Sequence, residues 1–147
     1  MVESYSLEEL RRFAGHEVVD VNGESVGFVD LLFLDDETGR PEWVGVWNGV
    51  WETRPRVLVP LRGVEVVGET LRVPWTKDLI ERAPSYSEED DRGVLGDDPH
   101  GFGISREKER DAYRHYGVEP PGERAGDVAA PRYRAERLDE GGPGATR

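Results

Sequence analysis

One stretch of the sequence decides the fold: residues 24–47, which read ESVGFVDLLFLDDETGRPEWVGVW. It predicts two long antiparallel strands, 25–35 and 41–47, joined by a turn, because Asp hydrogen-bonds its own backbone there and Gly accepts a positive φ. The first strand is apolar on both faces and therefore needs cover on both sides. Gly27 and Gly45 leave room for strands to curl tightly. The pattern predicts a small closed or nearly closed β-barrel.

A first short hairpin precedes this central pair. The Asn22-Gly23 dipeptide predicts a two-residue turn, because both central positions of that turn need a positive φ. The turn would pair Asp20 with Ser25 and extend the sheet on its N-terminal side. A strand is therefore expected over residues 16–21.

A second short hairpin follows the central pair. Gly68 and Glu69 mark its turn, and pairing across the turn sets Glu65 against Arg72, an opposite-charge pair that helps to fix the register. Together these patterns predict a mostly β chain built as a six-stranded antiparallel barrel. The expected strands span residues 16–21, 25–35, 41–47, 56–60, 63–67 and 70–74.

Short helices are expected at the N-terminus and after the barrel. A capping box from Ser6 to Glu9 begins the first helix, and Thr76 caps another directly after the last strand. A longer helix over 105–116 ends at Gly117. From residue 119 onward Pro, Gly, Arg and Ala alternate without periodicity, which predicts disorder with at most a helical turn near residues 133–138. The expected organisation is a lead-in helix (1–15), a barrel domain (16–83), an acidic loop (84–104), an appended helix (105–117) and a disordered tail (118–147).

Composition limits the classes of function. The chain has 147 residues, no Cys and a net charge of −12 from 31 acidic and 19 basic residues. Without Cys, a disulfide framework and a thiolate metal site are impossible. The acidic balance opposes binding to nucleic acid and to anionic membranes. With no apolar run long enough to span a membrane and no signal peptide at the N-terminus, we expect a cytoplasmic protein without membrane insertion.

Four short motifs carry a family resemblance. They are VGFVD at 26–30, VP at 59–60, VPWTK at 73–77 and AYRHYG at 112–117. In their order and spacing the first three resemble the PRC-barrel domain over about residues 6–83. That β-barrel is shared by the cytoplasmic part of the photosynthetic reaction-centre H subunit and the C-terminal half of the ribosome maturation factor. The last motif resembles the appended helix of stand-alone bacterial PRC-barrel proteins.

The resemblance implies a non-enzymatic protein-interaction or oligomerisation module. It leaves three alternatives: an accessory of a photosynthetic or electron-transfer complex, a small-ligand or ion binder at the barrel mouth, and an RNA- or ribosome-associated factor. The chain lacks the membrane helix of the H subunit and the RNA-associated domain of the maturation factor, and its acidity opposes RNA. A protein partner, or a second copy of the chain in a homo-oligomer, is therefore expected.

Five residues are candidates for the contact surface. The segment 47–55 joins two strands and carries Trp47, Trp51 and Arg54, and exposed Trp beside Arg is typical of interface hot spots. Tyr113 and Tyr116 are the aromatic stripe of the appended helix. The alternative for each is packing: Trp47 would cap the barrel interior, and Trp51 would lie against the two tyrosines, since isolated aromatic residues usually pack.

No residue pattern indicates catalysis, a cofactor or a metal. The acids at 35–37 and 97–98 lack the ligand spacing and central Gly of a calcium loop. His16, His100 and His115 occur singly. No Gly-x-Ser-x-Gly motif is present, and carboxylate pairs lie in an expected loop, where no apolar pocket would shift their pKa. We therefore expect no catalytic, cofactor-binding or metal-ligating residues.

Overall fold

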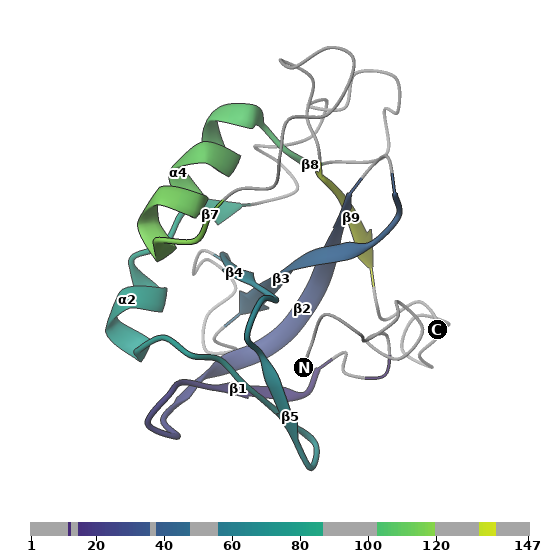
Figure 1. The fold of residues 1–147 in the computed structure, drawn as a ribbon. Coiled ribbons are helices and arrows are strands. Elements are labelled where there is room, and N and C mark those ends of the chain that lie inside the picture. Colours follow the sequence, from purple (N-terminus) through teal and green to yellow (C-terminus); the bar gives the residue numbers. More distant parts are fainter. Residues whose placement is uncertain are drawn as a thin grey trace.

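In the part of the chain that the structure describes, a nine-stranded sheet with two helices on one side forms the fold (Figure 1). The computed structural model describes residues 12, 15–35, 38–47, 56–86, 103–119 and 133–137. Its strands are β1 (Glu17–Val19), β2 (Ser25–Asp35), β3 (Pro41–Trp47), β4 (Arg56–Pro60), β5 (Glu65–Val67), β6 (Thr70–Arg72), β7 (Ser85–Tyr86), β8 (Gly103–Ile104) and β9 (Tyr133–Arg137). Its helices are α2 (Lys77–Glu81) and α4 (Arg106–Tyr116). The chain is therefore mostly β, as the sequence predicts.

The closed six-stranded antiparallel barrel is not confirmed. Hydrogen-bonded strands follow the order β5-β6-β1-β2-β3-β4-β7, and within the described residues β5 and β7 are not paired with each other. These end strands have only three and two residues, so the ring of hydrogen bonds stays incomplete. In addition, one pair of strands is parallel instead of antiparallel: β6 lies beside β1, with Val18 opposite Leu71. The expected lead-in helix lies outside the described residues except for Arg12 and Gly15.

The central strands have the predicted bounds. β2, β3 and β4 begin and end where the sequence indicates, and β2 pairs with β3 in the register Leu32 opposite Val44. The other edge of β2 is shared by two strands. β1 pairs with its first part, from Ser25 to Phe28, and β9 pairs with its last part, from Leu31 to Asp35. This long strand therefore connects two differently built halves of the sheet.

The first hairpin has a different register from the predicted one. Val19, not Asp20, pairs with Ser25. Gly23 has a φ of 86°, whereas no described residue other than glycine has a positive φ, so Asn22 does not adopt the expected turn conformation. The reason is Asp20, whose side chain caps the turn. The second hairpin is confirmed, with Glu65 opposite Arg72.

Asp20 is a buried carboxylate that joins the hairpin to α2. Its Oδ1 accepts hydrogen bonds from the backbone N–H groups of Asn22 and Glu24, each at 2.8 Å. Its Oδ2 accepts from the N–H of Lys77, also at 2.8 Å. Burial alone would raise the pKa of this carboxyl, but the backbone donors, led by that of Glu24, outweigh burial and lower the pKa. The side chain is 1% exposed, so its role is structural.

The C-terminal part of the chain contains more strand than the sequence predicts. β9 lies within the segment expected to be disordered, and it is a strand where at most a helical turn was expected. β7 and β8 lie within the expected acidic loop. Burial of Tyr133, which is 0% exposed, explains why β9 is ordered on the sheet. Both helices are confirmed, with Thr76 and Ser105 as their N-caps.

Candidate interaction surface

The appended helix packs on its own sheet, which decides between the two roles considered for its tyrosines. Tyr113 and Tyr116 are both buried. The ring centroid of Tyr113 lies 5.0 Å from that of Trp43, and its hydroxyl is hydrogen-bonded to the hydroxyl of Tyr133. Burial, reinforced by Tyr133, raises the pKa of Tyr113. Neither ring of α4 is therefore available as a contact surface in this structure.

Tyr116 has an equally structural position. Its hydroxyl donates to the carbonyl of Leu58 at 2.6 Å, and its ring centroid lies 4.8 Å from that of Trp75. Burial raises its pKa. The neighbouring His115 places its Nε2 2.7 Å from the carbonyl of Leu79, which joins α4 to α2. The stripe of α4 is a core element, in agreement with the packing alternative.

The remaining predicted residues come from the segment after β3. Trp51 and Arg54 lie outside the described residues. Trp47, the last residue of β3, is half-buried and stands directly opposite Phe28 of β2. Partners in an antiparallel pair place their side chains on the same face. Phe28 is 38% exposed, so this cross-strand aromatic pair is open to solvent on one side.

Arg56 completes the pair into a small surface. Its guanidinium lies over the ring of Trp47, 5.6 Å from the ring centroid, within the range of a cation–π contact. Arg56 is the first residue of β4 and is itself half-buried. We call Phe28, Trp47 and Arg56 the aromatic surface. Phe28 was not a candidate from the sequence, although the turn between the central strands would have placed it close to Trp47.

A partly buried network of Asp30 and Tyr86 holds the guanidinium of Arg56 in place. The Arg56 Nε lies 3.0 Å from Oδ2 of Asp30, and the hydroxyl of Tyr86 donates to the same oxygen at 2.8 Å. Burial, reinforced by the charge of Asp30, raises the pKa of Tyr86 well above its usual value, so this hydroxyl remains a donor. The Tyr86 ring crosses the sheet over Gly45, where any side chain would overlap it. Asp30 and Tyr86 are positioning residues that the sequence did not indicate, because Tyr86 fell in an expected loop.

Comparison with known proteins assigns the sheet to a family. The family model described as the PRC-barrel domain matches residues 7–80. The chain belongs to the PRC-barrel family. The match covers more than half of the chain, and it includes the whole aromatic surface. The elements α4, β8 and β9 of this PRC-barrel protein lie beyond the match. No curated protein matches the sequence.

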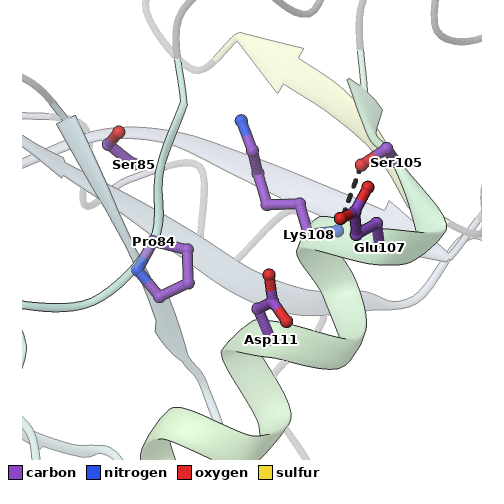
Figure 2. Close-up of a pocket in the computed structure, with 6 residues that line it drawn as sticks. All are labelled: Pro84, Ser85, Ser105, Glu107, Lys108 and Asp111. Atoms are coloured by element: carbon purple, nitrogen blue, oxygen red, sulfur yellow. Dashed lines mark hydrogen bonds between the residues drawn. The ribbon is translucent and has the colours of Figure 1, made fainter.

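A second surface feature of the PRC-barrel protein is a shallow cleft beside α4. Figure 2 shows the side chain of Lys108 in this cleft, between the helix and the segment of Pro84 and Ser85. The cleft has a volume of about 290 Å³, and its other lining residues are Ser105, Glu107 and Asp111. Small-molecule sites are usually larger and mostly apolar. Pro84 is the one apolar residue of this lining, so the cleft offers little desolvation to a ligand.

Two further observations concern the ion and membrane expectations. Within the described ranges, no three side chains of His, Cys, Asp or Glu lie close enough together to hold a metal ion. Of the acids considered in the sequence, Asp35 lies within these ranges, whereas Asp36, Glu37, Asp97 and Asp98 lie outside them. Neither described helix, α2 or α4, has both the length and the apolar character needed to cross a membrane.

Proposed function

We propose that this PRC-barrel protein is a non-enzymatic interaction module that binds a protein partner through the aromatic surface. The observation that carries the proposal is the exposed ring of Phe28 in register with Trp47. Aromatic residues and Arg are enriched among the residues that dominate binding energies at protein interfaces. Phe28 and Trp47 would form the apolar contact, and Arg56 would form the charged part of its rim.

The aromatic surface is already held in a fixed geometry. The ring of Trp47 is stacked by Arg56, and Asp30 and Tyr86 hold that guanidinium in place. A surface ordered before binding loses less conformational entropy when a partner arrives. The three side chains also lie on adjacent strands of the central sheet, not on an isolated loop. These features favour recognition of a defined partner surface.

The charge of the chain indicates the chemistry of the partner. A net charge of −12 attracts a basic partner within about 8 Å of the surface at physiological ionic strength and accelerates its association. The aromatic surface itself can receive one apolar side chain beside the Trp47 ring. We therefore expect a protein of positive net charge that presents an apolar anchor to the aromatic surface.

The test replaces Phe28 by Ser and compares partner capture with the unchanged chain. Proteins retained by the unchanged chain would be identified, purified and titrated against both chains by calorimetry. Phe28→Ser should weaken binding about tenfold or more, because it removes the exposed apolar anchor. Sedimentation of each chain alone distinguishes a separate partner from self-association.

A matched control is available on another strand. Val67 of β5 is 54% exposed and lies outside the aromatic surface, so Val67→Ser removes exposed apolar area elsewhere. It should leave the affinity unchanged. If Phe28→Ser binds the purified partner as tightly as Val67→Ser does, the aromatic surface is not the binding site and the proposal is wrong.

A further inference from the structure

The last part of β2 receives a strand from the far end of the chain. β9 pairs antiparallel with β2 through five residue pairs, from Leu31 opposite Arg137 to Asp35 opposite Tyr133. It also pairs with β8 on its other side. Nearly a hundred residues separate β9 from its partner strand in the sequence. An extended segment added to a sheet edge is a common mode of peptide recognition, in which the main chain provides affinity and side-chain pockets provide specificity.

A side-chain pocket accompanies this edge. Tyr133 is fully buried, and its ring centroid lies 6.2 Å from that of Trp43. Its hydroxyl is hydrogen-bonded to that of Tyr113 on α4. Two residues later Ala135 stands opposite Phe33, on the same face of the strand. The edge therefore selects an aromatic residue with a hydroxyl, followed at the second position by a small residue.

The connection to β9 allows the strand to reach another molecule. Residues 120–132, PPGERAGDVAAPR, contain three prolines and two glycines. The fourteen peptide units from Glu119 to Tyr133 span at most about 50 Å when extended. This reach is longer than the diameter of a small domain, which is about 30 Å. Covalent geometry therefore permits β9 to dock either on its own sheet or on that of a neighbour.

We propose that the β2 edge from Leu31 to Asp35 is a strand-accepting site whose intermolecular occupant is the segment Tyr133–Arg137 of a second copy of this chain. The segment that fits the site is known from the structure itself, and every copy carries one. Exchange of identical elements is a low-cost route to dimers, because the exchanged contacts are the same as the internal ones. For a short linker the internal copy competes at an effective concentration of the order of millimolar, so exchange increases with protein concentration.

This inference does not depend on the aromatic surface. The strand-accepting site lies on the other half of β2, and the PRC-barrel match ends before β9 begins. A failure of the proposed function would leave strand exchange untouched, and the reverse also holds. Phe28→Ser should therefore have no effect in the experiment that follows.

Because the chain contains no Cys, a disulfide can trap the exchanged strand. Leu34 and Arg134 are directly opposite across the β2–β9 pair. Partners in an antiparallel pair have Cα separations of about 4.5–5.5 Å, within the range that a disulfide bridges. One full-length chain would carry Leu34→Cys as the acceptor, and another would carry Arg134→Cys as the donor. A single chain with both substitutions tests whether the register accepts the bond.

Mixing acceptor and donor under oxidising conditions should give a disulfide-linked heterodimer whose yield rises with concentration. The matched control replaces the donor by Glu69→Cys, an exposed turn residue outside the pair. A yield no higher than this control at every concentration, while the doubly substituted chain still forms its internal bond, would overturn the proposal.

Tyr133→Ala gives effects of opposite sign in the two chains. In the donor it should lower the heterodimer yield about tenfold or more, because the incoming strand loses its buried anchor. In the acceptor it should raise the yield, because the chain's own β9 no longer holds the edge. General unfolding would lower the yield in both positions, which would contradict the proposal. If Tyr133→Ala does not fold, Tyr133→Phe removes only the contact with the Tyr113 hydroxyl and should show the same signs.

A synthetic peptide provides an independent measurement. The peptide with the sequence of residues 131–139 should compete with the donor and lower the heterodimer yield in proportion to its concentration. The same peptide with Tyr133→Ala should not compete. Equal competition by both peptides would show that the β2 edge does not distinguish Tyr133 from alanine.

Discussion

The two halves of β2 are covered in different ways. The first half lies beside β1, which is close in sequence, and it leaves Phe28 38% exposed. The second half lies beside β9, from the other end of the chain, and its Phe33 is 0% exposed. The two phenylalanines are five residues apart on one strand. They differ in the strand that lies beside their part of β2, which is β1 for Phe28 and β9 for Phe33.

This difference separates two kinds of role. The first half and the aromatic surface lie within the PRC-barrel match, whereas the elements that seal the second half, α4 and β9, lie beyond it. The additions therefore bury aromatic residues at one end of the sheet and leave the other end open. An aromatic pair exposed to solvent is suited to binding a partner, whereas a buried aromatic pair contributes to the stability of the fold.

The largest expected effect on stability is at the end of the sheet that α4 and β9 cover. Trp43→Ala should lower the free energy of unfolding by about 3–5 kcal/mol, because the ring is 1% exposed and contacts both Tyr113 and Tyr133. Trp47→Ala at the open end should cost less than about 1 kcal/mol, as expected for a partly exposed site. Urea unfolding followed by circular dichroism measures both. Equal losses would show that the two ends do not differ in this way.

The next effect concerns the carboxylate that holds the open half together. Asp20→Ala should lower the free energy of unfolding by about 2–4 kcal/mol at pH 7, because three backbone N–H groups lose their acceptor. The pKa of Asp20 is lower in the folded chain than the usual value of about 3.9. Its contribution is therefore complete above about pH 4 and is lost as the pH falls through the folded pKa. The difference between the two chains should shrink at pH 3, and a constant difference would show that the ionised carboxylate is not what stabilises the turn.

The smallest expected effect is at the boundary between the halves. Gly45→Ala should cost about 1–3 kcal/mol, because the added methyl group overlaps the Tyr86 ring and displaces it from Asp30. The loss should be accompanied by weaker partner binding, since Arg56 then loses part of its support. The control Gly68→Asn changes a turn glycine with open space around it and a φ of 64°, a conformation that Asn tolerates. A stable Gly45→Ala chain with unchanged binding would show that Tyr86 does not position Arg56.

Local patterns in the sequence were sufficient for the central strands and the helix caps. The bounds of β2, β3 and β4 follow from runs of apolar residues between turn residues, and Thr76 and Gly117 follow from capping preferences. The register of the first hairpin was wrong because the buried carboxylate of Asp20 changes the turn. That carboxylate is satisfied by Lys77, which is distant in sequence. A dipeptide preference cannot include such a contact.

The site was harder to predict than the fold, because it also depends on contacts between residues that are distant in sequence. Trp47 was recognised from its neighbours, but its partners Phe28 and Arg56 come from other strands. Tyr113 and Tyr116 looked equally suited to a contact surface. Their burial depends on Trp43, Trp75 and β9, and the short, polar segment of β9 gives no periodic signal of a strand. Pairing between strands that are far apart in the sequence decides which aromatic residues remain exposed on the surface.

The position of β9 also has a consequence for synthesis of the chain on the ribosome. Tyr133 is translated 47 residues after Tyr86, which ends the last strand that pairs with β4. At about 5–20 residues per second, this delay lasts roughly 2–9 s, longer than most small domains need to fold. During that time the nascent sheet has no β9 of its own, and the edge from Leu31 to Asp35 is vacant. A finished neighbour on the same messenger RNA is the nearest source of a strand to fill it.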